Sequence, residues 1–313
     1  MWKLKRTHTC DELRVAHEGE TVILNGWVMA RRDFGNLIFI DLRDRNGRTQ
    51  VIFSPDRKEE IVETASKLGK EFVVAVRGVV RKRGEGMINQ EIPTGEIEVE
   101  AEEIEILNEA KTPPFEITDR VNVSEDLRLQ HRYLDLRRPQ MQKNFLVRSK
   151  IIHAIREYMD EHGFTDIETP YMVKFTPGGA RNFITPSRHF PGKFFAFAES
   201  PQIFKQLFMV GGIDRYYQIA RCFRDEDLRA DRQLEFTQLD LEMSFVEEED
   251  VQKIVEGAVS AVWTKVLGKE TVGPFPVLSY DDAVLHYGSD KPDLRFDMKI
   301  WDVSDAVKES DFQ

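Results

Sequence analysis

The sequence has few cysteines and no long apolar run, and each absence narrows the class of protein. Cys10 and Cys222 are the only cysteines among 313 residues. They are too few and too far apart for a disulfide framework or a cysteine metal site, which favours a reducing cytoplasm. No segment reaches the ~18 uncharged apolar residues that a membrane helix needs. The basic start has no apolar run behind it, so we expect neither a secretory signal nor a membrane partner.

Charged residues are abundant but unevenly distributed. The chain has 55 Asp and Glu against 44 Lys and Arg, a net charge of -11, with 41% hydrophobic residues. These values indicate a soluble protein with ordinary hydrophobic cores. Residues 1–90 contain 17 basic and 13 acidic side chains, so they carry +4 and the rest carries -15. A basic first module favours a polyanion partner, although uneven surface charge without a partner explains the same split.

Residues 1–106 are predicted to form a β-barrel. Short β-branched or aromatic runs, separated by turn-forming residues, predict five strands. These strands are expected at residues 21–30, 37–42, 49–53, 72–81 and 97–106. Helical apolar spacing over residues 57–68 predicts one helix between the third and fourth strands. Five strands with a helix at this place are the layout of an OB-fold barrel.

The rest of the chain is predicted to mix helices and strands, which makes the fold class α+β. Residues 107–139 show little periodicity and are predicted to be a hinge or linker. A second domain is expected at 140–280, and the start of a further, truncated one at 281–313. Inside the second domain, helices are expected at 142–162, 201–209 and 250–267, and a strand at 164–170.

Two extended runs, 216–224 and 235–245, carry the functional argument. Because side chains alternate along a strand, one face of the second run is predicted to be a core face of Leu239, Leu241, Met243 and Phe245. Its other face would present Phe236, Gln238, Asp240, Glu242 and Ser244, and Arg224 would share a face with Cys222, Ala220 and Gln218. This pattern fits a β-hairpin with one solvent-exposed face. It also fits a ligand-binding face of the sheet, on which arginine holds a phosphate and an aromatic ring stacks on a base.

The same residues resemble a known family. Phe223-Arg-Asp-Glu226, a short loop and Arg232-Gln-Leu-Glu-Phe236-Thr-Gln-Leu-Asp240 are similar to motif 2 of the class II aminoacyl-tRNA synthetases. The helix before Gly163 and the segment 164–170 resemble their motif 1. Four blocks, at 133–139, 200–206, 224–232 and 287–295, resemble the bacterial-type aspartyl-tRNA synthetases, organellar ones included. The likeness runs from about Thr7 onward and implies an OB-fold barrel followed by a class II antiparallel sheet with helices.

The resemblance implies an ATP-dependent ligase that works in two steps. Aspartate and ATP would form aspartyl-adenylate with the help of Mg2+, and the aspartyl group would then pass to tRNA(Asp). Arg224 would be the catalytic residue, bridging the α-phosphate and the substrate carboxylate, and ATP would also contact Asp225, Glu226, Gln233 and Phe236. Aspartate would bind to Gln202, Lys205, Arg224 and Asp240, with Lys205 facing its side-chain carboxylate. Positioning and charge stabilisation suffice for this reaction, which agrees with the lack of a Ser-His or Cys-His pair.

The barrel of this family binds the anticodon. With Ile38 and Ile40 on the core face, Phe39 points outward and is expected to stack on a base, while Gln50 reads the base edge. Further anticodon contacts are expected at Arg32, Phe34 and Glu98. Phe34 occupies the loop position that bears on charging of tRNA(Asn). Phenylalanine is neither of the residue types associated with strict or relaxed enzymes, so whether tRNA(Asn) is also charged stays open. The family also implies a cytoplasmic homodimer formed through motif 1.

The sequence departs from the family pattern in two places. Gly178 stands where many bacterial relatives have a glutamate that holds the substrate ammonium; some relatives carry glycine, and we interpret it as a variant. Motif 3 and the late acidic Mg2+ ligands do not appear before Gln313, where family members begin an inserted domain. We therefore expect an N-terminal portion with an incomplete catalytic domain, no metal site of its own and less than full aminoacylation activity.

Two alternative functions remain open at this point. One is the related asparagine or lysine ligase, against which Lys205 and Asp240 argue because they favour a carboxylate side chain. The other is a non-catalytic RNA-binding OB-fold protein with a degenerate synthetase body. The absence of motif 3 favours this second alternative, and the intact motif 2 argues against it. Bacterial or organellar origin, and whether the short length is natural, are also open.

Overall fold

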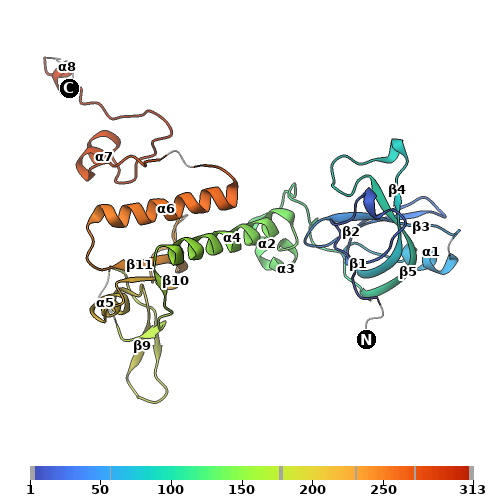
Figure 1. Ribbon diagram of the computed structural model, residues 1–313, viewed down its shortest axis with the longest axis horizontal. Coiled ribbons are helices and arrows are strands. Elements are labelled where there is room, and N and C mark those ends of the chain that lie inside the picture. Colours follow the sequence, from blue (N-terminus) through green and yellow to red (C-terminus); the bar gives the residue numbers. More distant parts are fainter. Residues whose placement is uncertain (1–3, 57, 176–178, 230, 271–272, 310–313) are drawn as a thin grey trace. The chain divides into compact units, whose positions relative to one another are not determined.

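The structure, a computed structural model, describes residues 4–56, 58–175, 179–229, 231–270 and 273–309. It divides into two compact units, Met1–Arg148 and Ser149–Gln313. Figure 1 shows a β-barrel in the first unit, and strands covered by helices in the second. The predicted α+β class with an N-terminal barrel is therefore confirmed.

Five strands close the barrel of the first unit. They are β1 (Thr21–Asp33), β2 (Ile38–Arg43), β3 (Arg48–Phe53), β4 (Val73–Lys82) and β5 (Ile97–Asn108), in the order β1-β2-β3-β5-β4. Among the described strands of the barrel, β3 and β5 are the one pair that runs in parallel. Ile38, Ile40 and Leu42 are at most 1% exposed, because alternate residues of β2 point into the barrel. The helix α1 (Glu59–Ser66) lies between β3 and β4 in sequence, as predicted, and the short helices η1 (Val15–His17) and η2 (Glu85–Met87) flank the strands.

The segment after the barrel contains two short helices that the sequence does not predict. They are α2 (Glu125–Gln130) and α3 (Arg132–Asp135), followed by the start of α4 (Pro139–Glu161). The Ser124 side chain caps α2 by accepting from the Leu127 amide. The buried carboxylate of Asp135 lies 3.0 Å from Nη1 of Arg138. Caps and ion pairs fix these helices, which are too short to show apolar periodicity.

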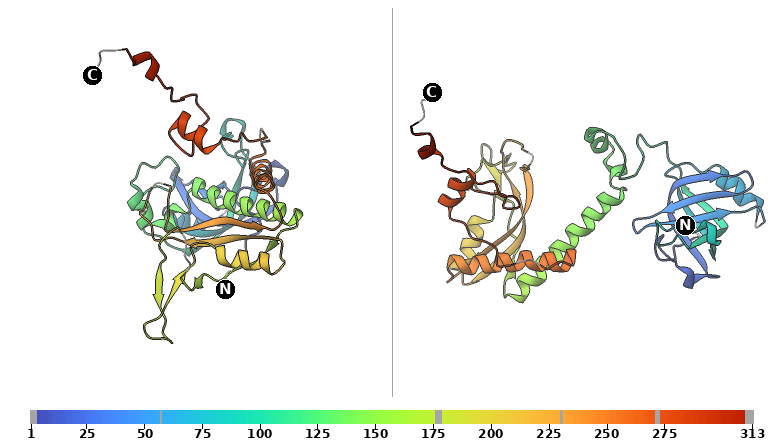
Figure 2. Two further views of the ribbon diagram at one scale, coloured as in Figure 1. Left: turned by 90° about the vertical axis from the view of Figure 1, so that its left-hand side faces the viewer. Right: turned by 90° about the horizontal axis from the view of Figure 1, so that it is seen from above.

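A three-stranded sheet forms the centre of the second unit. β10 (Arg215–Phe223) and β11 (Glu235–Met243) pair in antiparallel fashion, and β6 (Thr165–Asp166) pairs in parallel with β10. Figure 2 shows α4 and α6 (Glu248–Leu267) on one side of this sheet and α5 (Gln202–Val210) on the other. A smaller sheet contains β7 (Met172–Val173), β8 (Ile184–Pro186) and β9 (Phe194–Phe197), and the helices α7 (Tyr280–Tyr287) and α8 (Ser304–Val307) follow α6.

The apolar face of β11 packs against the helices. Leu239, Leu241 and Met243 contact a buried cluster that includes Met159 of α4 and Ile254 of α6. These three residues confirm the predicted core face. Two details of the prediction were wrong, and each concerns the end of a strand.

The first error is Phe245, which is 98% exposed and not part of the core. β11 ends at Met243, and Phe245 has a φ of +57°, so the alternation of faces does not continue to it. The second error is the predicted strand at 164–170, of which only Thr165–Asp166 is a strand. Beyond Asp166 a single backbone hydrogen bond, from the Ile167 amide to the Tyr217 carbonyl, continues the contact with β10.

Candidate functional site

The register of β10 and β11 places the predicted site residues on one face of the sheet. Gln218 is opposite Asp240, and Cys222 is opposite Phe236. Directly opposed residues of an antiparallel pair project to the same side, so these four side chains share a face. This is the face opposite Leu239 and Leu241, on the side where α5 lies.

Arg224 follows the last residue of β10 and lies over Phe236. Its guanidinium carbon is 5.0 Å from the ring centroid, which is a cation–π distance. The Arg224 amide donates to the Leu234 carbonyl at 2.9 Å and fixes the backbone of the connection. The side-chain Nε is buried and has no hydrogen-bond partner among the described residues. A buried guanidinium N–H without an acceptor is a place where a phosphate or carboxylate oxygen is stabilised.

Lys205 of α5 reaches two carboxylates on the polar face. Its Nζ is 3.2 Å from Oδ1 of Asp240 and 3.2 Å from Oε2 of Glu242, and its side chain is only 12% exposed. Burial raises the pKa of Asp240, and the ammonium of Lys205 opposes that rise. Gln202 begins α5 one helical turn earlier, so it lies on the same side of the helix as Lys205. The structure thus brings Lys205 and Asp240 together as predicted.

The connection between the two strands carries the other predicted nucleotide contacts. Oε2 of Glu226 is 3.0 Å from Nη1 of Arg232, which ties the two sides of the connection together. The Asp225 amide donates to the Arg181 carbonyl at 2.9 Å. The side chains of Asp225 and Gln233 are exposed. Gly178 lies outside the described residues.

Several polar contacts in the second unit were missed by the sequence analysis. Thr169 donates to Oε1 of Gln218 at 2.9 Å, and the Tyr216 hydroxyl donates to the same oxygen at 2.8 Å. The buried carboxylate of Glu199 accepts from the Ala180 amide at 3.1 Å. Glu242 was assigned to the polar face, but its contact with Lys205 was not predicted. Apart from the bond between Tyr216 and Gln218, each contact joins segments that are distant in sequence, so no local pattern indicates it.

Cys222 is on the same face but is not suited to nucleophilic chemistry. Burial, followed by the nearby charge of Asp240, raises the pKa of its thiol to about 11. The thiol is therefore protonated at neutral pH, whereas a nucleophilic cysteine must be a thiolate. Its Sγ lies 3.1 Å from Oε1 of Gln238, as a weak donor. The site offers positioning and charge without a covalent nucleophile at this cysteine.

A second group of predicted residues lies together on the barrel. Arg32 donates from Nη2 to Oδ1 of Asp41 and to Oε1 of Gln50, both at 3.0 Å. Gln50 in turn donates to Oε2 of Glu98 at 2.8 Å. Phe39 is opposite Arg32 in the ladder between β1 and β2, which places it beside this network.

Two aromatic rings border this network. Phe34 meets Phe39 edge to face, with centroids 5.9 Å apart, and is 69% exposed. The sequence analysis missed Asp41, and it also missed Arg83. Burial lowers the pKa of Arg83, while the charges of Glu98 and Asp41 oppose that shift, so Arg83 belongs to the same charged group. Outward rings beside hydrogen-bonding side chains are the parts from which OB-folds build base-binding platforms.

A cationic cavity of about 630 Å³ adds a third feature, in the first unit. Six basic and three acidic side chains line it, and the basic ones are Arg43, Arg45, Arg48, Arg120, Arg137 and Lys143. Nη1 of Arg43 is buried and has no hydrogen-bond partner among the described residues. An excess of positive charge in a hollow suits a phosphate backbone. Within the described residues, no helix is both long and apolar enough to cross a membrane.

Known protein families match both the barrel and the part of the chain that follows it. Residues 22–107 match the family described as "OB-fold nucleic acid binding domain", and residues 124–309 match "tRNA synthetases class II (D, K and N)". The chain is 56% identical over 310 residues to the aspartate--tRNA(Asp/Asn) ligase of Desulfosudis oleivorans, covering 99% of this chain and 52% of that protein. It is 54% identical over 309 residues to the aspartate--tRNA ligase of Bacillus licheniformis, covering 98% and 52%. The chain thus spans about half the length of the curated relatives it matches.

A solved structure shows the same fold. The asparaginyl-tRNA synthetase of Pyrococcus horikoshii, complexed with asparaginyl-adenylate, is 28% identical with a TM-score of 0.74, covering 85% of this chain and 59% of that one. The match to the class II description covers more than half of the chain and includes both strands of the polar face. The chain therefore belongs to the class II tRNA synthetases of the D, K and N group, with an OB-fold nucleic acid binding domain at its N-terminal side.

Proposed function

We propose that this chain is part of a ligase that activates L-aspartate with ATP and transfers it to tRNA(Asp). One observation carries the proposal: Lys205, largely buried between Asp240 and Glu242, lies on the polar face that also presents Arg224 and Phe236. An ammonium on this face suits the side-chain carboxylate of aspartate, and a guanidinium without an acceptor at its Nε suits the reacting phosphate. Relatives named as aspartate ligases support the assignment.

In the first step, an oxygen of the aspartate α-carboxylate forms a bond to the α-phosphorus of ATP, and pyrophosphate leaves with the electrons of the broken P–O bond. Arg224 would donate to oxygens of both reactants and offset the charge that develops at phosphorus. Adenine would stack on Phe236, and Glu226, which pairs with Arg232 here, would accept from the adenine amine. Asp225 and Gln233 are exposed beside them and would complete the ATP contacts.

Selection of aspartate would depend on Lys205. Asp240 and Glu242 hold its ammonium in place before substrate arrives, which reduces the ordering cost of binding. Asparagine has no charge to offer to this ammonium, so its amide would bind less well in the same position. Gln202, one turn earlier on α5, would contact the same substrate.

Mg2+ supplies charge neutralisation at the phosphates in this chemistry. Among the described residues, the one close group of three or more candidate metal ligands contains two histidines and one glutamate. Mg2+ prefers oxygen ligands in octahedral geometry, so that group does not fit it.

On the barrel, we infer that Phe39 and Gln50 contact an anticodon base, with Arg32, Phe34 and Glu98 around them. The network from Arg32 through Gln50 to Glu98 fixes the Gln50 amide, so that it can read a base edge with little loss of freedom. Relatives named aspartate--tRNA(Asp/Asn) ligase and aspartate--tRNA ligase are almost equally similar, at 56% and 54% identity. Their names therefore assign neither specificity to this chain.

Truncation of the half-buried ring of Phe39 tests the barrel's role. Phe39→Ala is expected to weaken tRNA(Asp) binding about tenfold at fixed salt, because stacking of one base contributes ~1–3 kcal/mol. Phe39→Tyr keeps the ring and should retain the affinity of the original protein. Filter binding or fluorescence anisotropy with tRNA(Asp) measures both. Unchanged affinity in Phe39→Ala would remove Phe39 from the interface.

The ligase itself is tested by amino-acid-dependent exchange of pyrophosphate into ATP, measured on the full-length gene product. We expect exchange with aspartate to exceed exchange with asparagine and lysine. Faster exchange with asparagine or lysine would reassign the substrate. No exchange with any of the three, together with retained tRNA binding, would favour a non-catalytic RNA-binding protein.

A further inference from the structure

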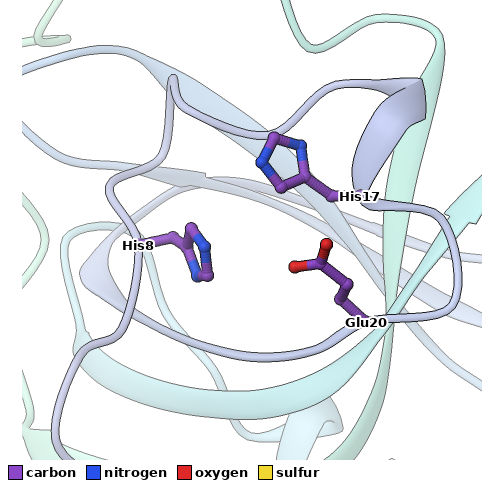
Figure 3. Close-up of side chains that lie close together, drawn as sticks. All are labelled: His8, His17 and Glu20. Carbon is purple, nitrogen blue, oxygen red and sulfur yellow. The ribbon is translucent and has the colours of Figure 1, made fainter.

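Two histidines and a glutamate meet at the N-terminal side of the barrel, and none of them belongs to the sites described above. His8 lies in the segment before η1, His17 is the last residue of η1, and Glu20 directly precedes β1. Their ligand atoms all lie within 4.8 Å of one another. Figure 3 shows the two rings and the carboxylate pointing toward a common space. The rings are nearly perpendicular, at 75°, with centroids 5.8 Å apart.

Each histidine has an outer hydrogen-bond partner at its Nδ1. Nδ1 of His8 is 3.0 Å from Oγ1 of Thr7, and that hydroxyl already donates its proton to the Ile23 carbonyl at 3.3 Å. The Thr7 oxygen can therefore accept a proton from Nδ1 of His8. Nδ1 of His17 accepts from the Arg14 amide at 3.1 Å and also lies 3.3 Å from the Arg14 carbonyl oxygen. With Nδ1 of His8 protonated, its Nε2 keeps a lone pair, which is the usual arrangement of a metal-binding histidine. At His17, an ion bound at Nε2 requires the proton on Nδ1, where the Arg14 carbonyl oxygen accepts it in place of the amide bond.

The backbone holds the three residues in place. The Thr7 amide donates to the Ile23 carbonyl at 2.9 Å and attaches the His8 segment to β1. The Glu20 amide donates to the His17 carbonyl, and the Glu20 carbonyl accepts from Val80 of β4, both at 3.0 Å. Ligands on a fixed backbone lose little freedom when they bind an ion.

We propose that His8, His17 and Glu20 form a binding site for a divalent transition-metal ion, with Zn2+ as the best match. Two imidazoles and a carboxylate are a ligand set of Zn2+, whereas Mg2+ and Ca2+ prefer oxygen alone. Tetrahedral ligands of Zn2+ lie about 3.3 Å apart, so small side-chain rotations close the present spacing. Water takes the fourth position. The ion joins the segment before η1 to the start of β1 and thereby stabilises the barrel.

Metal titration tests the site directly. Untagged protein is titrated with ZnCl2 against a chromophoric chelator, and with CoCl2, whose visible absorption reports tetrahedral nitrogen and oxygen ligands. We expect one strong site, and a loss of affinity of about tenfold or more in His8→Ala, in His17→Ala and in Glu20→Gln. His189→Ala, which removes an exposed histidine of the second unit, should bind like the original protein.

A thermal readout separates metal binding from damage to the fold. Zn2+ should raise the unfolding temperature of the original protein and of His189→Ala, but not that of Glu20→Gln. Glu20 is exposed, so this variant is expected to fold normally without metal. Absence of stoichiometric Zn2+ binding, or equal binding in all three ligand variants and the control, would overturn the proposal.

Discussion

Arg224→Ala should lower aspartate-dependent ATP–pyrophosphate exchange by about 10²–10³-fold, because removal of one positioned donor from a developing anion has this cost. The guanidinium over Phe236 has a buried Nε without an acceptor, and the α-phosphate would supply one. Since the interaction forms mainly in the transition state, we expect kcat to fall more than KM rises. Steady-state exchange assays on the full-length gene product measure both constants.

The strand itself supplies a matched control. Arg221 lies on β10, three residues before Arg224, and on the opposite face of the strand from Cys222. It is 47% exposed and pairs with Glu235 at 3.1 Å on the surface. Arg221→Ala removes the same type of side chain and should leave the exchange rate within about twofold, because surface ion pairs contribute little. Equal losses in both variants would mean that Arg224 acts through the fold and not through the substrate.

Lys205→Met should lower kcat/KM for aspartate by about 10²-fold or more. Loss of one partner of a buried charged pair costs ~2–5 kcal/mol. The lost partner here is Lys205, and its removal would leave the carboxylates of the substrate and Asp240 without their ammonium. The pKa of Asp240, already raised by burial, should rise further once the opposing ammonium is removed. We expect the KM for aspartate to rise while the KM for ATP stays nearly constant.

Discrimination against asparagine provides the decisive comparison for Lys205. The preference for aspartate over asparagine should shrink in Lys205→Met, since the variant has lost the charge that distinguishes them. Lys253→Met, on an exposed part of α6, removes a lysine that is 76% exposed and should keep the original preference. A preserved aspartate preference in Lys205→Met would show that another group selects the substrate.

The sequence predicted those parts of the fold that depend on local pattern. Alternation along β2 placed Ile38 and Ile40 inside and Phe39 outside, and alternation along β11 separated Leu239 from Asp240. The same rule failed at Phe245, because the strand had already ended and the backbone there has a positive φ. The helices α2 and α3 were missed because a cap and the ion pairs of Asp135 fix them, and neither produces a periodic pattern.

The candidate sites could be predicted only where a motif carries them. Motif 2 identified Arg224, Phe236 and Asp240, whose shared face the structure confirms. The contact of Lys205 with Glu242 and the charged neighbours of Arg83 depend on tertiary pairing, so no motif indicates them. The same holds for His8, which the hydrogen bond between Thr7 and Ile23 brings toward His17 and Glu20.

We infer that the polar face of β10 and β11 binds aspartyl-adenylate. Calorimetry with a non-hydrolysable aspartyl-adenylate analogue and its asparaginyl counterpart, on the full-length gene product, tests it most directly. We expect the aspartyl analogue to bind more tightly than the asparaginyl one. Arg224→Ala should lose most of that affinity, and Arg221→Ala should lose none. Tighter binding of the asparaginyl analogue, or equal affinity in the original protein and Arg224→Ala, would contradict it.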